Sequence, residues 1–210
     1  RDSIPLSILL RLLDMHSLSV NDVPDCKLGF KRDDTLVNRY LPINDSFMRL
    51  SGYFLSEGFL REAKDTYQVD LAGSKEDFRG DMMACIRDVF GDGFNPYINE
   101  NRITISNRVI LHVFRDILGF KATARTKRVP SFMFRLPLVK ISNLIKAYFS
   151  GDGSVDPVRK TIDCTSVHRD LLVDMDFLLL RFGIFSGIDE SYHGDYVEYK
   201  IRIRGENVLL

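Results

Sequence analysis

The pattern of apolar and polar residues along the chain occurs twice, about 95 residues apart. The first copy opens with LSGYFLSEG (50–58) and the second with IKAYFSGDG (145–153). In both stretches an apolar segment of helical type ends at an acid that is followed by glycine. Aligning the two Tyr-Phe pairs places Glu57 on Asp152, which indicates a duplicated unit.

The match continues downstream, where 68–91 parallels 161–183 and 101–110 parallels 199–208. Alternating residues in QVDLA and TIDCT predict strands, and apolar residues three and four apart predict a helix after each strand. Tight turns are expected at 99–101 and 193–195. The sequence therefore predicts an α+β fold of two pseudo-symmetric αββαββα halves with antiparallel sheets, packed through the two repeated helices.

Four segments follow from the repeat. Residues 1–48 form an N-terminal extension with an amphipathic helix at about 4–15 and a partly basic loop around Lys27, Lys31 and Arg32. Residues 49–120 form the first half, 121–140 a basic linker and 141–210 the second half.

Bulk composition excludes several classes of protein. No apolar run approaches 18 residues, so we expect no membrane-spanning segment. The three cysteines are widely spaced, so free thiols in a reducing, intracellular compartment are expected rather than disulfides or a zinc site.

Net charge is zero, yet the distribution of charge is uneven. No acid occurs between Asp116 and Asp152, whereas seven cations do: Lys121, Arg125, Lys127, Arg128, Arg135, Lys140 and Lys146. This pattern favours contact with a polyanion, through Arg125, Lys127 and Arg128, over a merely solvated linker.

Small residues lie four apart on each repeated helix, Gly52 and Ser56 on one and Ala147 and Gly151 on the other. Four apart is one helix face, so the two helices can pack closely in parallel and bring their acids side by side. Paired carboxylates repel unless a cation binds. With the Ser56 and Gly151 carbonyls, Glu57 and Asp152 would make an all-oxygen site suited to Mg²⁺ or Mn²⁺. The alternative is an ordinary glycine C-cap beside a surface acid.

The two nonapeptides resemble the motif of the LAGLIDADG homing endonucleases, with the acid at its eighth position. KRVP (127–130) and YKIRIRG (199–205) are also similar to endonuclease domains embedded in inteins. The resemblance implies a monomeric pseudo-dimer that cleaves double-stranded DNA with divalent metal. The similarity to intein-embedded domains implies fusion to splicing segments in a full-length protein. It also implies that Glu57 and Asp152 are the catalytic metal ligands, supported by Lys200 and Arg102.

A two-stranded ribbon fits the major groove of DNA, so outward residues of the predicted ribbons are candidate base readers. They are Asn99, Asn101, Arg102 and Thr104 in the first half, and Tyr199, Lys200, Arg202 and Arg204 in the second. Two other interpretations stay open at this point. One is a non-cleaving regulator or RNA maturase on the same scaffold, and the other is a structural domain without a nucleic-acid role.

Overall fold

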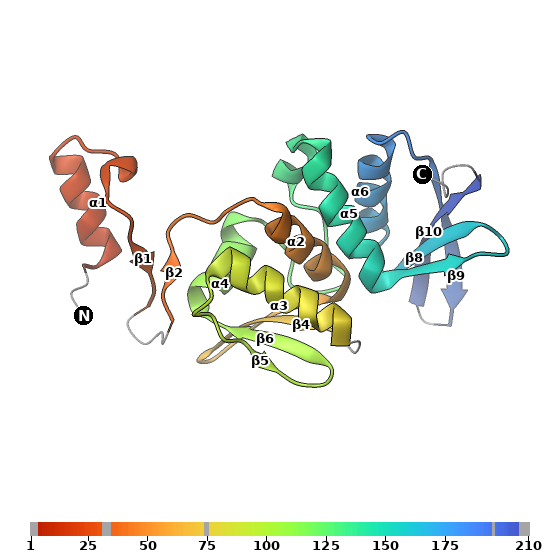
Figure 1. Cartoon of the computed structure of the whole chain (residues 1–210), viewed down its shortest axis with the longest axis horizontal. Coiled ribbons are helices and arrows are strands. Elements are labelled where there is room, and N and C mark those ends of the chain that lie inside the picture. Colours follow the sequence, from red (N-terminus) through yellow and green to blue (C-terminus); the bar gives the residue numbers. More distant parts are fainter. Residues whose placement is uncertain (1–3, 31–34, 74–75, 195, 206–210) are drawn as a thin grey trace.

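Two four-stranded antiparallel sheets flank a central pair of helices (Figure 1). The computed structural model describes residues 4–30, 35–73, 76–194 and 196–205 of the chain. The first sheet has the order β3-β4-β6-β5 and the second β7-β8-β10-β9. Their bounds are β3 Gly58–Ala63, β4 Thr66–Ala72, β5 Tyr97–Ile98, β6 Arg102–Ser106, β7 Gly153–Asp156, β8 Thr161–Ser166, β9 Ser186–His193 and β10 Tyr196–Arg204. The matching order of strands confirms the predicted duplication.

Each sheet packs its apolar face against helices of its own half. The first half contributes α2 (Asp45–Glu57), α3 (Glu76–Phe90), α4 (Arg108–His112) and the π-helical turn η2 (Val113–Ile117). The second contributes α5 (Leu138–Asp152) and α6 (Arg169–Leu180), preceded by the short 3-10 helix η3 (Ser131–Arg135). Phe47, Phe54 and Tyr148 on the two central helices have no exposed surface. Burial of each such side chain stabilises the fold by roughly 1.5–3 kcal/mol.

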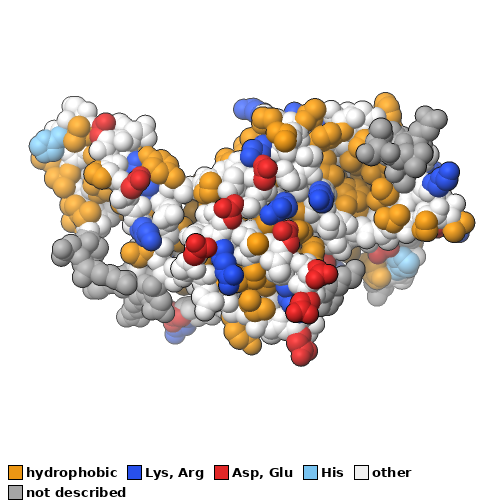
Figure 2. All heavy atoms as spheres, viewed as in Figure 1, with side chains coloured by type: hydrophobic (Ala, Val, Ile, Leu, Met, Phe, Trp, Pro, Cys, Tyr) orange, Lys and Arg blue, Asp and Glu red, His pale blue; other side chains and the backbone are white. Residues whose placement is uncertain are grey.

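Residues before the first half form a separate appendage at one end of the molecule (Figure 1). It holds α1 (Leu6–Met15), η1 (Val20–Asp22), β1 (Lys27–Leu28) and β2 (Val37–Asn38). The predicted N-terminal helix is confirmed, but only its Leu13 is buried, and hydrophobic side chains gather over it at the far left of Figure 2. Lys31 and Arg32 of the predicted basic loop lie outside the described residues.

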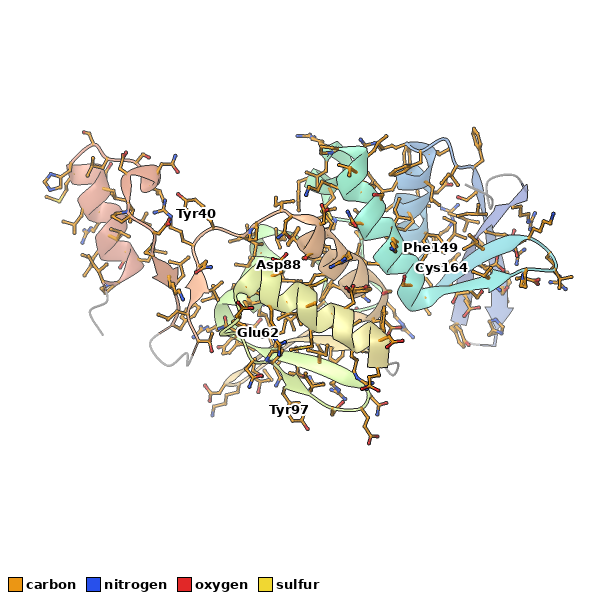
Figure 3. All side chains as sticks on the ribbon, viewed as in Figure 1. Tyr40, Glu62, Asp88, Tyr97, Phe149 and Cys164 are labelled. Carbon is orange, nitrogen blue, oxygen red and sulfur yellow. The ribbon has the colours of Figure 1, made fainter. Side chains whose placement is uncertain are left out.

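The central helices α2 and α5 begin as well as end together. Asn44 caps α2 by accepting from the amide of Phe47, and its side-chain amide donates to Asp88 on α3 (Figure 3). Lys140, on the first turn of α5, forms a 2.6 Å ion pair with Asp45, on the first turn of α2. This contact joins positions 95 residues apart, the offset of the repeat itself.

The sequence predicts neither a membrane-spanning helix nor disulfide bonds. Among the described residues no helix is both long and apolar enough to cross a membrane. Cys26, Cys85 and Cys164 are all free thiols, as expected.

Candidate metal and nucleic-acid site

Each of the two acids is the last residue of a central helix, and the glycine after it is the first residue of a strand. α2 ends at Glu57 and β3 begins at Gly58, while α5 ends at Asp152 and β7 begins at Gly153. Both glycines have negative φ, −86° and −81°, so neither is a left-handed helix cap. Both glycines are C-cap residues, but the left-handed glycine cap that would explain them is excluded.

The glycines are required by space instead. A Cβ at position 58 would lie 2.7 Å from the Cα of Phe54, and a Cβ at position 153 would overlap the carbonyl of Phe149. Helix and strand thus meet in a turn that has no room for a side chain. The acid just before the turn is held at a defined point, the shared end of the two helices.

Close packing of α2 on α5 brings the two acids to the same place. A Cβ on Gly52 would lie 2.7 Å from that of Ala147, and a Cβ on Gly151 would lie 2.8 Å from that of Ser56 and 3.4 Å from the Cγ of Glu57. The small residues predicted for the helix contact are therefore the residues at the contact. Because the backbones nearly touch here, the carboxylates of Glu57 and Asp152 act on one another electrostatically.

A lysine from the linker lies close enough to both acids to interact with them electrostatically. Lys127 is only 3% exposed, and its Nζ donates a 2.8 Å hydrogen bond to the carbonyl of Ser56. Burial lowers the pKa of Lys127 to about 8, against the opposing attraction of Asp152 and Glu57. The sequence predicts that Lys127 contacts phosphate from the basic linker, and in the structure its side chain is buried because the linker folds inward over the helix ends.

Both carboxyl groups are harder to ionise than usual. Burial, and to a smaller extent the negative charge of Glu57, raises the pKa of Asp152 to about 6, and the positive charge of Lys127 opposes this shift. Burial also raises the pKa of Glu57, again opposed by Lys127. The desolvating surroundings of Asp152 include Tyr148 and Cys164, both essentially unexposed; Cys164 lies at the lower end of α5 near Phe149 in Figure 3. One lysine only partly offsets two half-buried acids, so the site favours a further cation.

The donor set fits a hard divalent cation. Two carboxylates and the carbonyls of Ser56 and Gly151 are all oxygen ligands, which Mg²⁺ and Mn²⁺ accept. Among the described residues no cluster of three His, Cys, Asp or Glu side chains could hold a metal by itself. Water or phosphate oxygens would have to complete the coordination, as is usual for Mg²⁺.

A hollow of about 220 Å³ opens beside Asp152, and Glu57 does not line it. Its polar lining comes from both halves and from the linker: Ser56, Lys127, Asp152, Thr165, Ser166 and Glu198. Neither Lys200 nor Arg102 belongs to this lining. Lys127 is therefore the lysine that the structure brings to the acids, in the place expected for Lys200.

The rest of the linker combines packed and exposed residues. The carbonyl of Ala122 accepts from the amide of Leu60, on the edge strand β3. Arg128 Nε and Nη2 donate to the Asp174 carboxylate at 2.7 and 2.8 Å, and Nη1 lies 3.1 Å from Asp170. Arg128 thus fixes the linker to α6, and its contact with phosphate stays a prediction. Arg125 is exposed, and no ion pair links it to another described residue.

In the first half, the predicted base readers have unequal access to solvent. Asn99 accepts from the amides of Asn101 and Arg102, so it shapes the predicted turn between β5 and β6. Thr104 is buried and donates to the carboxylate of Asp70. Asn101 is exposed and Arg102 is half-buried, so these two remain candidates for contact with a ligand on this face.

In the second half, Tyr199 is on the wrong face. Successive residues of a strand point to opposite sides. Ile201 and Ile203 are buried against the helices, and Tyr199 shares their side, partly packed against the core. Lys200, Arg202 and Arg204 therefore lie on the outer face, and Tyr199 does not. The prediction that Tyr199 and Lys200 both point outward is wrong for Tyr199.

Comparison with known proteins gives one family. Residues 140–210 match the model of the LAGLIDADG-like domain. The DNA polymerase II large subunit of Thermococcus kodakarensis is 40% identical over 185 residues, covering 88% of this chain and 10% of that protein. The DNA-directed RNA polymerase subunit Rpo1C of Methanocaldococcus jannaschii is 28% identical over 163 residues, covering 76% and 18%. The chain thus spans between a tenth and a fifth of these relatives.

Solved structures share the fold. The crystal structure of I-DmoI in complex with DNA and Mn matches with a TM-score of 0.58 and 14% identity, covering 80% of this chain and 94% of that one. The N-terminal LAGLIDADG domain of DUF199/WhiA matches with a TM-score of 0.53 and 11% identity, covering 81% and 80%. At these identities the similarity concerns the fold alone.

Proposed function

This chain belongs to the LAGLIDADG family, and from that premise we propose that it is a site-specific, divalent-metal-dependent endonuclease of double-stranded DNA. The observation that carries the proposal is the convergence of Glu57, Asp152 and Lys127 at the shared end of α2 and α5. Two partly neutralised acids and a buried amine are costly to a fold that has no use for them.

Glu57 and Asp152, with the carbonyls of Ser56 and Gly151, hold Mg²⁺ or Mn²⁺ in this proposal. The homing endonuclease I-DmoI has been crystallised on DNA with Mn and with Ca, which supports divalent-metal use by this fold. A bound divalent cation would supply Lewis-acid stabilisation of the scissile phosphate and a more acidic water.

The protein groups supply the rest. Lys127 has its amine in the hollow where a phosphate would lie, and a pKa of about 8 suits it to donate or exchange a proton near neutral pH. Lys200 and Arg102, further out on the strands, support the phosphate charge by contact with the DNA backbone. Thr165 and Ser166 can hydrogen-bond water or phosphate at the wall of the hollow.

The outer faces of the two sheets bind the duplex, one half to each side of the cleaved bonds. Asn99, Asn101, Arg102, Lys200, Arg202 and Arg204 contact bases or phosphates there, and Arg125 contacts phosphate from the linker. Because one chain carries both acids, a monomer completes the site. Since the halves differ in sequence, the DNA site is imperfectly symmetric.

The relatives also suggest a context for the chain. A DNA polymerase subunit and an RNA polymerase subunit perform different reactions, yet both contain a segment similar to this one. A mobile segment inserted into host proteins, such as an intein with its endonuclease, accounts for that distribution. In that case the chain is fused to splicing segments and acts inside the cell.

The test begins with calorimetric titration of Ca²⁺ into the protein on a generic duplex. We expect binding in the wild type and its loss in the Glu57→Gln/Asp152→Asn variant, with unchanged duplex affinity. Mg²⁺ with a random-sequence duplex library would then yield fragments with a common end sequence, and Asp152→Asn would yield none. Acid-independent metal uptake, or cutting by Asp152→Asn, would refute the proposal. Duplex binding without metal uptake would favour a non-cleaving regulator or maturase.

A further inference from the structure

The outer face of β10 carries three cations at alternate positions, Lys200, Arg202 and Arg204. Its neighbours place acids among them. On β9, Asp189 lies directly across from Lys200, and on β8, Asp163 lies directly across from Arg202. Cations and acids therefore share one face of the second sheet.

The arginines of this face are occupied by those acids. Arg202 donates two hydrogen bonds to the carboxylate of Asp163, from Nε at 2.8 Å and from Nη2 at 3.3 Å. Its Nη1 donates to Asp189 at 2.8 Å. The other arginine, Arg204, lies 3.6 Å from the same Asp189 oxygen. Asp189 thus bridges the two arginines.

The first half is built differently at the equivalent positions. Asp70, the counterpart of Asp163, is buried, and Thr104 rather than an arginine lies across from it. Within the described part of the chain, no carboxylate lies within ion-pair distance of Arg102. Arg102 is therefore without an ion pair to a described carboxylate, although Arg61 on β3 lies 3.8 Å from Asp70. In the second half, two of the three outer cations of β10 are paired with acids.

The two acids of the second half differ in how easily they can be displaced. The Asp163 side chain is 16% exposed and grips Arg202 by two hydrogen bonds, whereas that of Asp189 is 51% exposed. An exposed ion pair contributes little to stability, so a ligand with well-aligned acceptors can replace Asp189. Asp163 then remains behind Arg202 and holds its guanidinium in one orientation.

We propose that Asp189 is a specificity-determining residue, which competes with DNA phosphates for Arg202 and Arg204. This inference rests on the proposed binding of duplex DNA to the sheets. On a generic duplex the acid keeps both arginines, so Arg102 and Arg125 provide most of the attraction. At the right sequence, a guanine edge offers two acceptors in bidentate geometry and replaces the carboxylate.

The chain contains a matched control for this proposal. Glu190 follows Asp189 on β9, is about equally exposed, and by strand alternation faces the opposite side, where it lies 3.7 Å from Arg169. Asp189→Asn and Glu190→Gln therefore remove the same charge from adjacent residues on opposite faces. A long-range effect of net charge would be similar in both variants.

The measurement is fluorescence anisotropy of a labelled generic duplex in Ca²⁺, over a series of salt concentrations. We expect Asp189→Asn to bind about three- to tenfold more tightly at low salt, with a salt slope steeper by about one, since one more phosphate contact forms. Glu190→Gln should match the wild type. In Asp189→Asn/Arg202→Gln the gain should largely disappear.

Sequence selection provides a second readout. Duplexes recovered from a random library by Asp189→Asn should show weaker base preference under the second half than those recovered by the wild type. An equal gain in both single variants, or no gain in Asp189→Asn while it melts like the wild type, would overturn the role of Asp189 but leave the endonuclease proposal standing. Failure of the wild type itself to bind duplex would overturn both.

Discussion

The ammonium group of Lys127 donates a hydrogen bond to the carbonyl of Ser56, the residue directly before the acid Glu57. In the proposed enzyme this carbonyl is a metal ligand. The lysine and the metal therefore draw on the same oxygen and the same two carboxylates, and their occupancies are coupled.

Lys127→Met separates these roles. Without the competing ammonium, Ca²⁺ affinity should rise about fivefold or more, in the usual range of such couplings. Cleavage should nevertheless fall by about a hundredfold or more, because a proton-exchanging group is lost. Calorimetry and a cleavage time course measure the two. Lys121→Met, an exposed lysine on the same linker, should change neither, and Lys200→Ala should slow cleavage less than Lys127→Met.

Stability of the metal-free protein should depend on pH through Asp152. Its pKa of about 6 lies above the ordinary 3.8, so the folded state holds a proton that the unfolded state releases between these values. The free energy of unfolding therefore falls as pH rises through this window. Asp152→Asn removes this loss and should be more stable than wild type by about 1–3 kcal/mol at pH 7.

Urea unfolding in EDTA at pH 4 and pH 7 measures this difference. The advantage of Asp152→Asn should be small at pH 4 and should grow toward pH 7. Asp92→Asn, which alters an exposed acid after α3, should show no such growth. A constant difference between Asp152→Asn and wild type across the range would contradict the assignment.

Contact between the central helices leaves no room for a methyl group at Gly52. Gly52→Ala would overlap the carbonyl of Leu144 and lie 2.9 Å from the amide nitrogen of Tyr148. We expect a loss of about 1–3 kcal/mol, because overpacking must shift backbone. Gly80→Ala within α3 meets nothing within 4 Å and should instead gain up to about 1 kcal/mol from helix propensity. Thermal melting of both variants tests the pair.

Two linker arginines three positions apart should give opposite phenotypes. Arg128→Gln leaves Asp174, which is 5% exposed, without its guanidinium partner, and should lose roughly 1–3 kcal/mol of stability. Arg125→Gln should melt like the wild type but bind generic duplex more weakly, with a shallower salt slope. Similar effects of both changes on DNA binding, with no loss of stability, would restore the interpretation of the linker as a uniform phosphate contact.

The fold was accessible from sequence because the repeat was strong. Matching Glu57 to Asp152, with small residues four apart before each, was enough to predict which helices pair and which ends meet. The sequence predicts the strand that contains Tyr199 correctly, but it places the Tyr199 side chain on the wrong face of the sheet. Alternation along a strand already forbids Tyr199 and Lys200 from sharing a face.

Lys127 was harder to place, because a run of cations gives no indication of which one is buried. Burial depends on how the linker crosses the helix ends, a contact between residues 71 apart. A weak signal did exist. Lys-Arg occurs at 127–128 and also at 31–32, before each repeated helix at nearly the same offset as the motif. That recurrence distinguishes Lys127 from the other linker cations.

The ion pair between Asp45 and Lys140 bears on how the two halves recognise each other. These residues occupy corresponding positions of the repeat, yet they carry opposite charges. If a half were to pair with a copy of itself, Asp45 would meet Asp45, or Lys140 would meet Lys140. Each half is therefore biased toward the other and away from its own kind. A gene split between the halves would therefore be expected to yield heterodimers of the two halves rather than homodimers of either one.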